Sequence, residues 1–225
     1  CVLCSRAMDF SIKHDRDNLF TYAGMEQFRG KYLVQDRSKK EIYETPQMLY
    51  MMVALTLFAK EKKENRLAWV KSYYDAISQF YISLPTPIMA GVRTPTRQFS
   101  SCVLIEAGDS LNSINATSTS IVKYISKKAG IGVGAGRIRA LGAKIGDGSV
   151  VHTGLIPFLK YFQAAVKSCS QGGVRGGAAT IYLPLWHYEF EDLIVLKNNK
   201  GTEETRVRHM DYAFQFNKLM YERLL

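Results

Sequence analysis

Apolar positions follow a helical period in the first part of the chain. Between Thr45 and Phe80 they recur three and four residues apart, and the charged run KEKKEN at 60–65 interrupts them. Thr45 offers a hydroxyl for an N-cap, and Pro46 suits the first helical position. The pattern therefore predicts a helical hairpin in which the methionines between 48 and 52 belong to the core.

Prolines end this helical part. Residues 85–98, PTPIMAGVRTPTRQ, contain three prolines and a glycine, which exclude a long regular element. We place a domain boundary near residue 97. It separates a mostly helical domain, residues 1–97, from a second domain, residues 98–225.

Strand-like and helix-like segments alternate in the second domain. Short apolar runs at 99–106 and 180–186 indicate strands, and the glycine-rich run at 130–136 indicates a strand or a turn. Longer periodic runs at 110–130, 153–169 and 187–199 indicate helices. This alternation predicts parallel βαβ units, and therefore an α/β layer or barrel. Functional sites in such folds lie at the ends of strands.

Composition narrows the class of protein. Thirty Lys and Arg against twenty Asp and Glu give a net charge of +10, which suits anionic partners such as nucleotides, nucleic acid or an acidic subunit, and equally a merely solubilising surface. No apolar run is long enough to span a membrane, and no signal peptide is evident. The four cysteines and four histidines lack disulfide-framework or metal-site spacing. We expect a cytoplasmic protein with no bound metal.

Two glycine-rich segments lie beside cationic residues. One is GIGVGAGRIRA at 130–140, and the other is SCSQGGVRGGAAT at 168–180. Glycine lets a ligand approach the backbone while the cations meet its phosphates, but neither a Rossmann fingerprint nor a Walker A loop is present. The residues alone leave nucleotide binding and tight packing equally open. They also leave Cys102 open as a pocket thiol or a small buried hydrophobe.

Four long segments are more specific than any of these patterns. They are PTPIMAGVRTPTRQFSSCVLIE (85–106), SINATSTSIVKYISKKAGIGVGAGRIRALG (113–142), HTGLIPFLKYFQAAVKSCSQGGVRGGAATIYLPLWHYEFEDLIVLKNN (152–199) and RVRHMDYAFQFNKLMYERLL (206–225). Together they resemble the large subunit of aerobic class Ia ribonucleotide reductases of the enterobacterial and T-even-phage branch. The resemblance implies a helical N-terminal segment followed by the first part of a ten-stranded α/β barrel. It also implies an oxidoreductase that reduces ribonucleoside diphosphates for DNA precursor synthesis.

The resemblance implies roles for the substrate-side residues. Cys102 matches a redox-active cysteine that reduces the ribose 2′ position as half of a thiol pair and ends as a disulfide, with its partner outside this chain. Thr86 and Ser101 match positions that hold the substrate diphosphate and sugar. Gly130 matches a backbone contact to the ribose.

The resemblance also implies an allosteric site for a deoxynucleoside triphosphate or ATP. Asp109, Ser110 and Leu111 match the start of the effector-binding helix, and Arg139 matches a phosphate-binding arginine. Relatives often carry a second arginine seven positions later, where this sequence has Gly146 followed by Asp147. Lys144 could substitute only as a point charge, so effector affinity or discrimination is expected to differ.

Residues 170–180 resemble the specificity loop, which lies between the effector and substrate sites and changes shape with the bound effector. Gln171 is expected to contact a base, and Arg175 the substrate base or phosphate. Low local stability would allow the loop its alternative shapes. The expected flexibility comes from the loop glycines Gly172, Gly173, Gly176 and Gly177.

Other parts of such an enzyme are not matched by these residues. The resemblance puts the radical-bearing cysteine, the tyrosine pair of the radical path and the shuttle cysteines downstream, and the ATP-cone upstream. We therefore expect this chain alone to be inactive and to bind no cofactor directly. The expected partners are a complementing C-terminal chain, a second large subunit, a small subunit with a di-iron tyrosyl radical, and thioredoxin or glutaredoxin.

Three alternatives remain open. A non-catalytic nucleotide-binding module would use the effector residues without needing Cys102. A cobalamin-dependent reductase relative is the alternative enzyme. A nucleic-acid-binding module is less well matched, because the arginines flank glycine turns instead of alternating with stacking aromatics.

Overall fold

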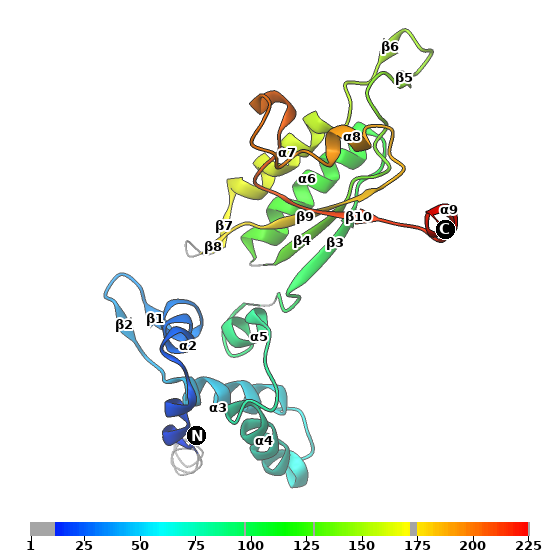
Figure 1. Ribbon diagram of the computed structural model, residues 1–225. Helices are drawn as coiled ribbons and strands as arrows, with labels where there is room; N and C mark the ends of the chain where they lie inside the picture. Colours follow the sequence, from blue (N-terminus) through cyan, green and yellow to red (C-terminus); the bar gives the residue numbers. More distant parts are fainter. Residues whose placement is uncertain (1–11, 97, 128, 172–174, 225) are drawn as a thin grey trace. The chain divides into compact units, whose positions relative to one another are not determined.

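The computed structural model describes residues 12–96, 98–127, 129–171 and 175–224. The chain divides into two compact units, Cys1–Ser101 and Cys102–Leu225, and each is described by itself (Figure 1). None of the helices in the described ranges is both long and apolar enough to cross a membrane.

The first unit consists of helices and one short hairpin. The predicted helical hairpin is confirmed, because two helices follow Thr45 with a turn at the charged run. Thr45 caps the first of them by accepting a hydrogen bond from the Met48 N–H at 3.3 Å. In chain order the elements are η1 (His14–Leu19), α2 (Tyr22–Gln27), the π-helical turn η2 (Phe28–Tyr32), β1 (Gln35–Asp36), β2 (Glu41–Ile42), α3 (Pro46–Leu57), α4 (Lys63–Ser78) and α5 (Thr86–Gly91).

The core of this unit lies mainly between α3 and α4. Leu49 and Val53 of α3 are buried together with Tyr74 and Ile77 of α4. Of the methionines between 48 and 52, only Met51 is buried, and Met48 and Met52 are exposed. Positions four residues apart share one face of a helix, so the prediction that the whole run is core was wrong for those two.

The second unit is organised around a parallel sheet. Its strands lie in the order β10-β9-β4-β3, and every neighbouring pair is parallel. Since this order follows the chain, each crossover adds a strand at the same edge, as in an α/β barrel. The elements are β3 (Cys102–Glu106), α6 (Leu111–Ser126), β4 (Gly130–Gly134), β5 (Lys144–Ile145), β6 (Val150–Val151), α7 (Ile156–Ser168), β7 (Ser170–Gln171), β8 (Arg175–Gly176), β9 (Ala179–Pro184), α8 (Phe190–Leu193), η3 (Glu203–Thr205), β10 (Asp211–Gln215) and α9 (Lys218–Leu224).

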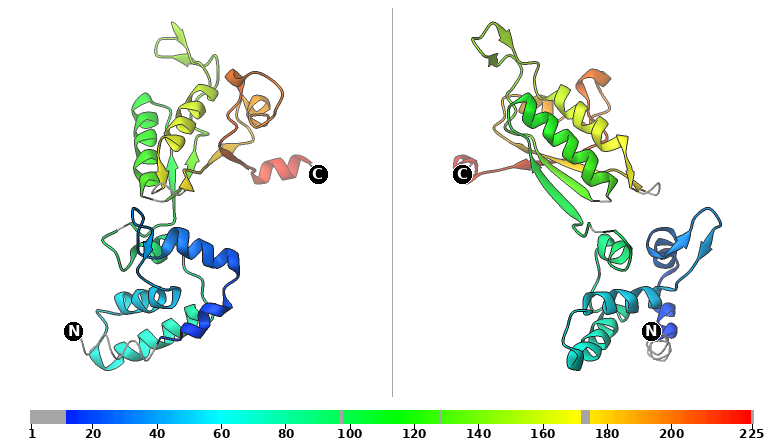
Figure 2. Two further views of the ribbon diagram at one scale, coloured as in Figure 1. Left: turned by 90° about the vertical axis from the view of Figure 1, so that its left-hand side faces the viewer. Right: turned by 180° about the vertical axis from the view of Figure 1, so that it is seen from behind.

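One face of the sheet is covered by α6 and α7 (Figure 2). Ile121 of α6 and Phe162 of α7 are fully buried against Val133 and Ile181 of the central strands. The opposite face carries the alternate residues of β3, and Leu104 there is 77% exposed. Among the residues that the structure describes, this face is not covered by α6 or α7, and it is called the uncovered face below.

Two parts of the second unit differ from the sequence prediction. The prediction of a helix over residues 187–199 was wrong, because only Phe190–Leu193 forms a helix there, α8. The following residues turn instead, and the Asn198 side chain accepts a hydrogen bond from the Lys200 N–H at 2.9 Å, a local bond that competes with helix. The edge strand β10 and the short β5–β6 hairpin were not predicted.

Candidate functional site

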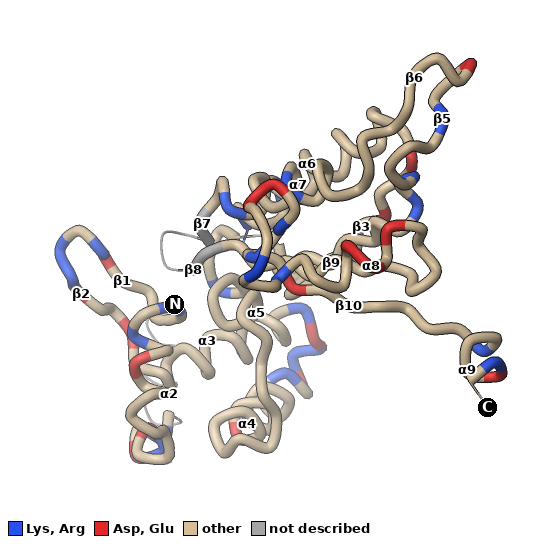
Figure 3. Tube along the Cα trace, turned by 45° about the horizontal axis from the view of Figure 1, so that its top comes forward, with Lys and Arg blue, Asp and Glu red and all other residues tan. Residues whose placement is uncertain are grey.

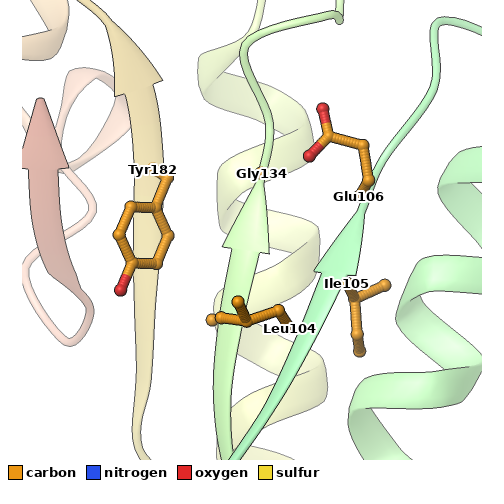
Figure 4. Close-up of a pocket in the computed structure, with 6 residues that line it drawn as sticks. Leu104, Ile105, Glu106, Gly134 and Tyr182 are labelled. Atoms are coloured by element: carbon orange, nitrogen blue, oxygen red, sulfur yellow. The ribbon is translucent and has the colours of Figure 1, made fainter. Parts of the chain in front are cut away.

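On the uncovered face of the sheet, the positions of β4 are occupied by glycines, called the glycine floor below. Alternate residues of β4 are glycine, and they pair in register with Cys102, Leu104 and Glu106 of β3. The side chains of Leu104, Glu106 and Tyr182 surround a hollow of about 330 Å³ over Gly132 and Gly134 (Figure 4). This volume is at the lower end of the range for small-molecule sites.

Neighbouring side chains lie over these glycines. A Cβ at Gly132 would lie 2.5 Å from Leu104 Cδ2 and 3.0 Å from Tyr182 Cε2. Leu104, Glu106 and Tyr182 were not predicted from the sequence. The two-residue period of a strand could have indicated Leu104 and Glu106, because it puts them on the same face of β3 as Cys102.

Cys102 is the first residue of β3, and its thiol is exposed. Its register partner on β4 is Gly130, which offers no side chain beside the thiol. Ser101 directly precedes the strand. This exposure favours a thiol open to a pocket over a small buried hydrophobe, and Cys102 and Gly130 lie side by side at one end of the sheet.

Thr86 belongs to the first unit, where it is the first residue of α5. Its hydroxyl oxygen lies 3.1 Å from the Tyr32 hydroxyl oxygen. The Tyr32 carbonyl accepts a hydrogen bond from Arg93 at 2.9 Å, and Arg93 forms a buried ion pair with Glu44. Thr86 is thus held at the end of a packed polar network.

Asp109 and Arg139 come together although thirty positions separate them. The carboxylate of Asp109 accepts hydrogen bonds from the Arg139 backbone N–H at 2.9 Å and from its Nε at 2.7 Å. Ser110 caps α6 by accepting a hydrogen bond from the Ser113 N–H, and the next residue, Leu111, is exposed. The structure therefore gathers all four residues matched to an effector site at the N-terminus of α6.

Residues 142–154, called the arm below, extend beyond this cluster as the β5–β6 hairpin. The Lys144 carbonyl accepts a hydrogen bond from Arg139 Nη1 at 2.8 Å. Gly146 has a φ of +58°, a conformation that favours glycine. Hydrogen bonds from the Ser149 hydroxyl and backbone N–H lower the pKa of Asp147. The arm carries both acidic and basic residues (Figure 3).

The segment matched to the specificity loop forms a short hairpin, in which Ser170 pairs with Gly176 and Gln171 with Arg175. Gly172 and Gly173 lie outside the described residues. Gly177 is buried, and a Cβ there would lie 2.2 Å from the Val166 carbonyl oxygen of α7. Gly177 therefore serves a close approach to a helix.

Comparisons with known proteins agree with this division of the chain. A family model described as "Ribonucleotide reductase, all-alpha domain" matches residues 18–97, and one described as "Ribonucleotide reductase, barrel domain" matches residues 100–225. The Escherichia coli protein named ribonucleoside-diphosphate reductase 1 subunit alpha is 66% identical over 98% of this chain. The enterobacteria phage T4 subunit alpha is 62% identical over 96%, and that of Treponema pallidum is 28% identical over 92%.

The matched regions are only part of these relatives. They cover 29% of the E. coli protein, 28% of the phage T4 protein and 24% of the T. pallidum protein. The chain thus spans less than a third of the length of each. Its helical unit and its parallel sheet with one-sided helices correspond to the all-alpha domain and to part of the barrel domain.

Proposed function

The chain belongs to the family of ribonucleotide reductase alpha subunits, and from this premise we propose that it supplies one redox thiol, part of the substrate cradle and the effector site of a ribonucleoside-diphosphate reductase. The observation that carries the proposal is the exposed thiol of Cys102 beside Gly130, on the glycine-floored face of the sheet. A thiol in this place can reach a substrate lying over the sheet.

The proposed reaction is a two-electron reduction of the ribose. Cys102 and a second thiol lose two hydrogen atoms and form a disulfide, while the C2′–O bond is replaced by a C2′–H bond and the oxygen leaves as water. Thr86 and Ser101 hold the diphosphate and sugar, and the Gly130 backbone contacts the ribose. The second thiol and the radical come from other residues of the complete enzyme.

The proposed partners follow from the same assignment. They are a nucleoside diphosphate as substrate, a small subunit whose di-iron tyrosyl radical starts the reaction, and a second copy of the large subunit. Thioredoxin or glutaredoxin returns the disulfide to thiols. A deoxynucleoside triphosphate or ATP is the proposed allosteric ligand.

The effector site is proposed at Asp109, Ser110, Leu111 and Arg139. The Asp109 carboxylate and the Lys144 carbonyl occupy Nε and Nη1 of Arg139, and within the described ranges Nη2 has no hydrogen-bond partner. A guanidinium fixed on two sides can present this remaining nitrogen to a phosphate oxygen. The backbone N–H groups at the start of α6 favour the same anionic ligand.

The test of the proposed function is reduction of CDP in the presence of the small radical subunit and a dithiol reductant. We expect the native polypeptide that contains these residues to form dCDP, and the 225-residue chain alone to form none. Turnover by the isolated chain would contradict the proposed division of the active site. Nucleotide binding without turnover by the native polypeptide would instead support a non-catalytic binding module.

Gly146→Arg restores, within the arm, the arginine that relatives often carry at this position. A second guanidinium near the effector phosphates is expected to strengthen dTTP binding about fivefold, the net of a charged hydrogen bond and the strain of a positive φ. Titration calorimetry of the native polypeptide measures the change. Gly148→Arg is the control for charge, because it adds the same charge to the arm, although a Cβ there would lie 3.3 Å from Lys144 Cδ and its φ is +90°. An equal gain in both variants would show a general effect of charge.

A further inference from the structure

Glu189 joins the two ends of the arm. Its Oε2 accepts hydrogen bonds from the Leu141 N–H at 3.1 Å and from the Leu155 N–H at 2.9 Å. These two residues directly flank the arm, residues 142–154, and Glu189 itself lies in the segment between β9 and α8. One carboxylate oxygen thus closes the base of the arm with two charge-assisted hydrogen bonds.

Gly154 lies against the Glu189 carboxylate and has a backbone conformation that favours glycine. Its φ is +92°, and a Cβ there would lie 2.6 Å from Glu189 Oε1 and 3.2 Å from Leu141 Cβ. The backbone conformation favours glycine here, and a Cβ would in addition crowd the Glu189 carboxylate. The position of Glu189 is built into the local structure and does not depend on a loose surface contact.

His187 holds the neighbouring loop. The Glu189 backbone N–H donates to His187 Nδ1 at 3.2 Å, so this nitrogen is the acceptor. The hydrogen is therefore on Nε2, which donates to the Ile138 carbonyl at 2.9 Å. Ile138 is buried and directly precedes Arg139. His187 and Glu189 together, called the clamp below, fix the chain on both sides of Arg139.

We propose that the clamp is a positioning device for the effector site, in which His187 and Glu189 hold the loop that aims Arg139 at the effector phosphates. The inference rests on the proposed effector site and deepens it. Neither clamp residue is placed against the ligand. Both act on the backbone at Ile138, Leu141 and Leu155, and the side chain of Arg139 is then oriented by Asp109 and the Lys144 carbonyl.

Glu189→Ala in the native polypeptide tests the clamp. Removing a charged acceptor from two backbone N–H groups is expected to raise the Kd for dTTP about tenfold. The KM for CDP without effector should stay within about twofold, because the substrate residues lie on other elements. Glu189→Gln keeps an oxygen acceptor in place and should restore most of the affinity. Glu191→Ala is the matched control, since it removes the same charge from an exposed side chain of α8.

Arg139→Ala separates the failure of this inference from that of the effector site. If Arg139→Ala binds dTTP as tightly as the unaltered protein, the proposed effector site is wrong and the clamp has no function to support. If Arg139→Ala weakens binding but Glu189→Ala does not, the clamp inference alone is overturned. A Glu189→Ala variant that loses dTTP and CDP affinity equally would likewise overturn it, because the residue would then have only a general structural role.

Discussion

Cys102→Ser is expected to abolish reduction of ribonucleoside diphosphates by the native polypeptide, lowering kcat by roughly a thousandfold or more. A serine hydroxyl has almost the size of the thiol but cannot form a disulfide, so the two electrons for the ribose have no source. Because Cys102 is exposed at the start of β3, the change should alter the free energy of unfolding by no more than about 0.5 kcal/mol. The variant is therefore expected to fold and to bind dTTP normally.

The measurement is a single-turnover assay with labelled CDP, run beside a dTTP titration of the same sample. Cys169→Ser is the control, because this cysteine packs partly against the core of the second unit and has no proposed role in the reaction. The Cys169→Ser variant should retain turnover. A Cys102→Ser variant that keeps more than about a tenth of the turnover would show that another thiol reduces the substrate.

Apolar patterning predicted β3, β9, α6 and α7 for a physical reason, and the glycine-rich β4 was predicted as a strand or a turn. The strands β3, β4 and β9 and the helices α6 and α7 form one shared core, so burial imposes a clear pattern on their sequences. The edge strand β10 is buried less regularly, with exposed residues at both ends and partly buried residues between them. The sequence of β10 therefore shows no comparable alternation of apolar and polar residues.

The geometry of the site was less predictable than the fold. The Asp109–Arg139 pair and the hydrogen bonds that the Glu189 carboxylate accepts from Leu141 and Leu155 link residues thirty or more positions apart. Both of these donors to Glu189 are backbone N–H groups. Backbone donors carry no residue identity, so no motif could have indicated the clamp. The proposed roles of Cys102, Thr86 and Arg139 came from the resemblance, and the structure adds their local partners.

Glu44→Ala is expected to lower the free energy of unfolding of the first unit by about 3–5 kcal/mol. The side chains of Arg93 and Glu44 are 3% and 9% exposed, and Arg93 Nε donates to Glu44 Oε2 at 3.0 Å. The carboxylate also accepts a hydrogen bond from the Val34 N–H at 2.7 Å. Its removal leaves a buried guanidinium without its counter-charge, whereas the Val34 N–H, on an exposed residue, can bond to water instead.

Urea unfolding of the native polypeptide, followed by a signal from the helical unit, measures this loss. Glu26→Ala is the matched control, since Glu26 pairs with Arg29 at 2.9 Å on the surface of the same unit and should cost no more than about 1 kcal/mol. Equal losses of unfolding free energy in the two variants would show that burial does not increase the contribution of the Arg93–Glu44 pair to stability. Because Arg93 also donates to the Tyr32 carbonyl, and the Tyr32 hydroxyl lies beside Thr86, a higher KM for CDP should accompany the loss of stability.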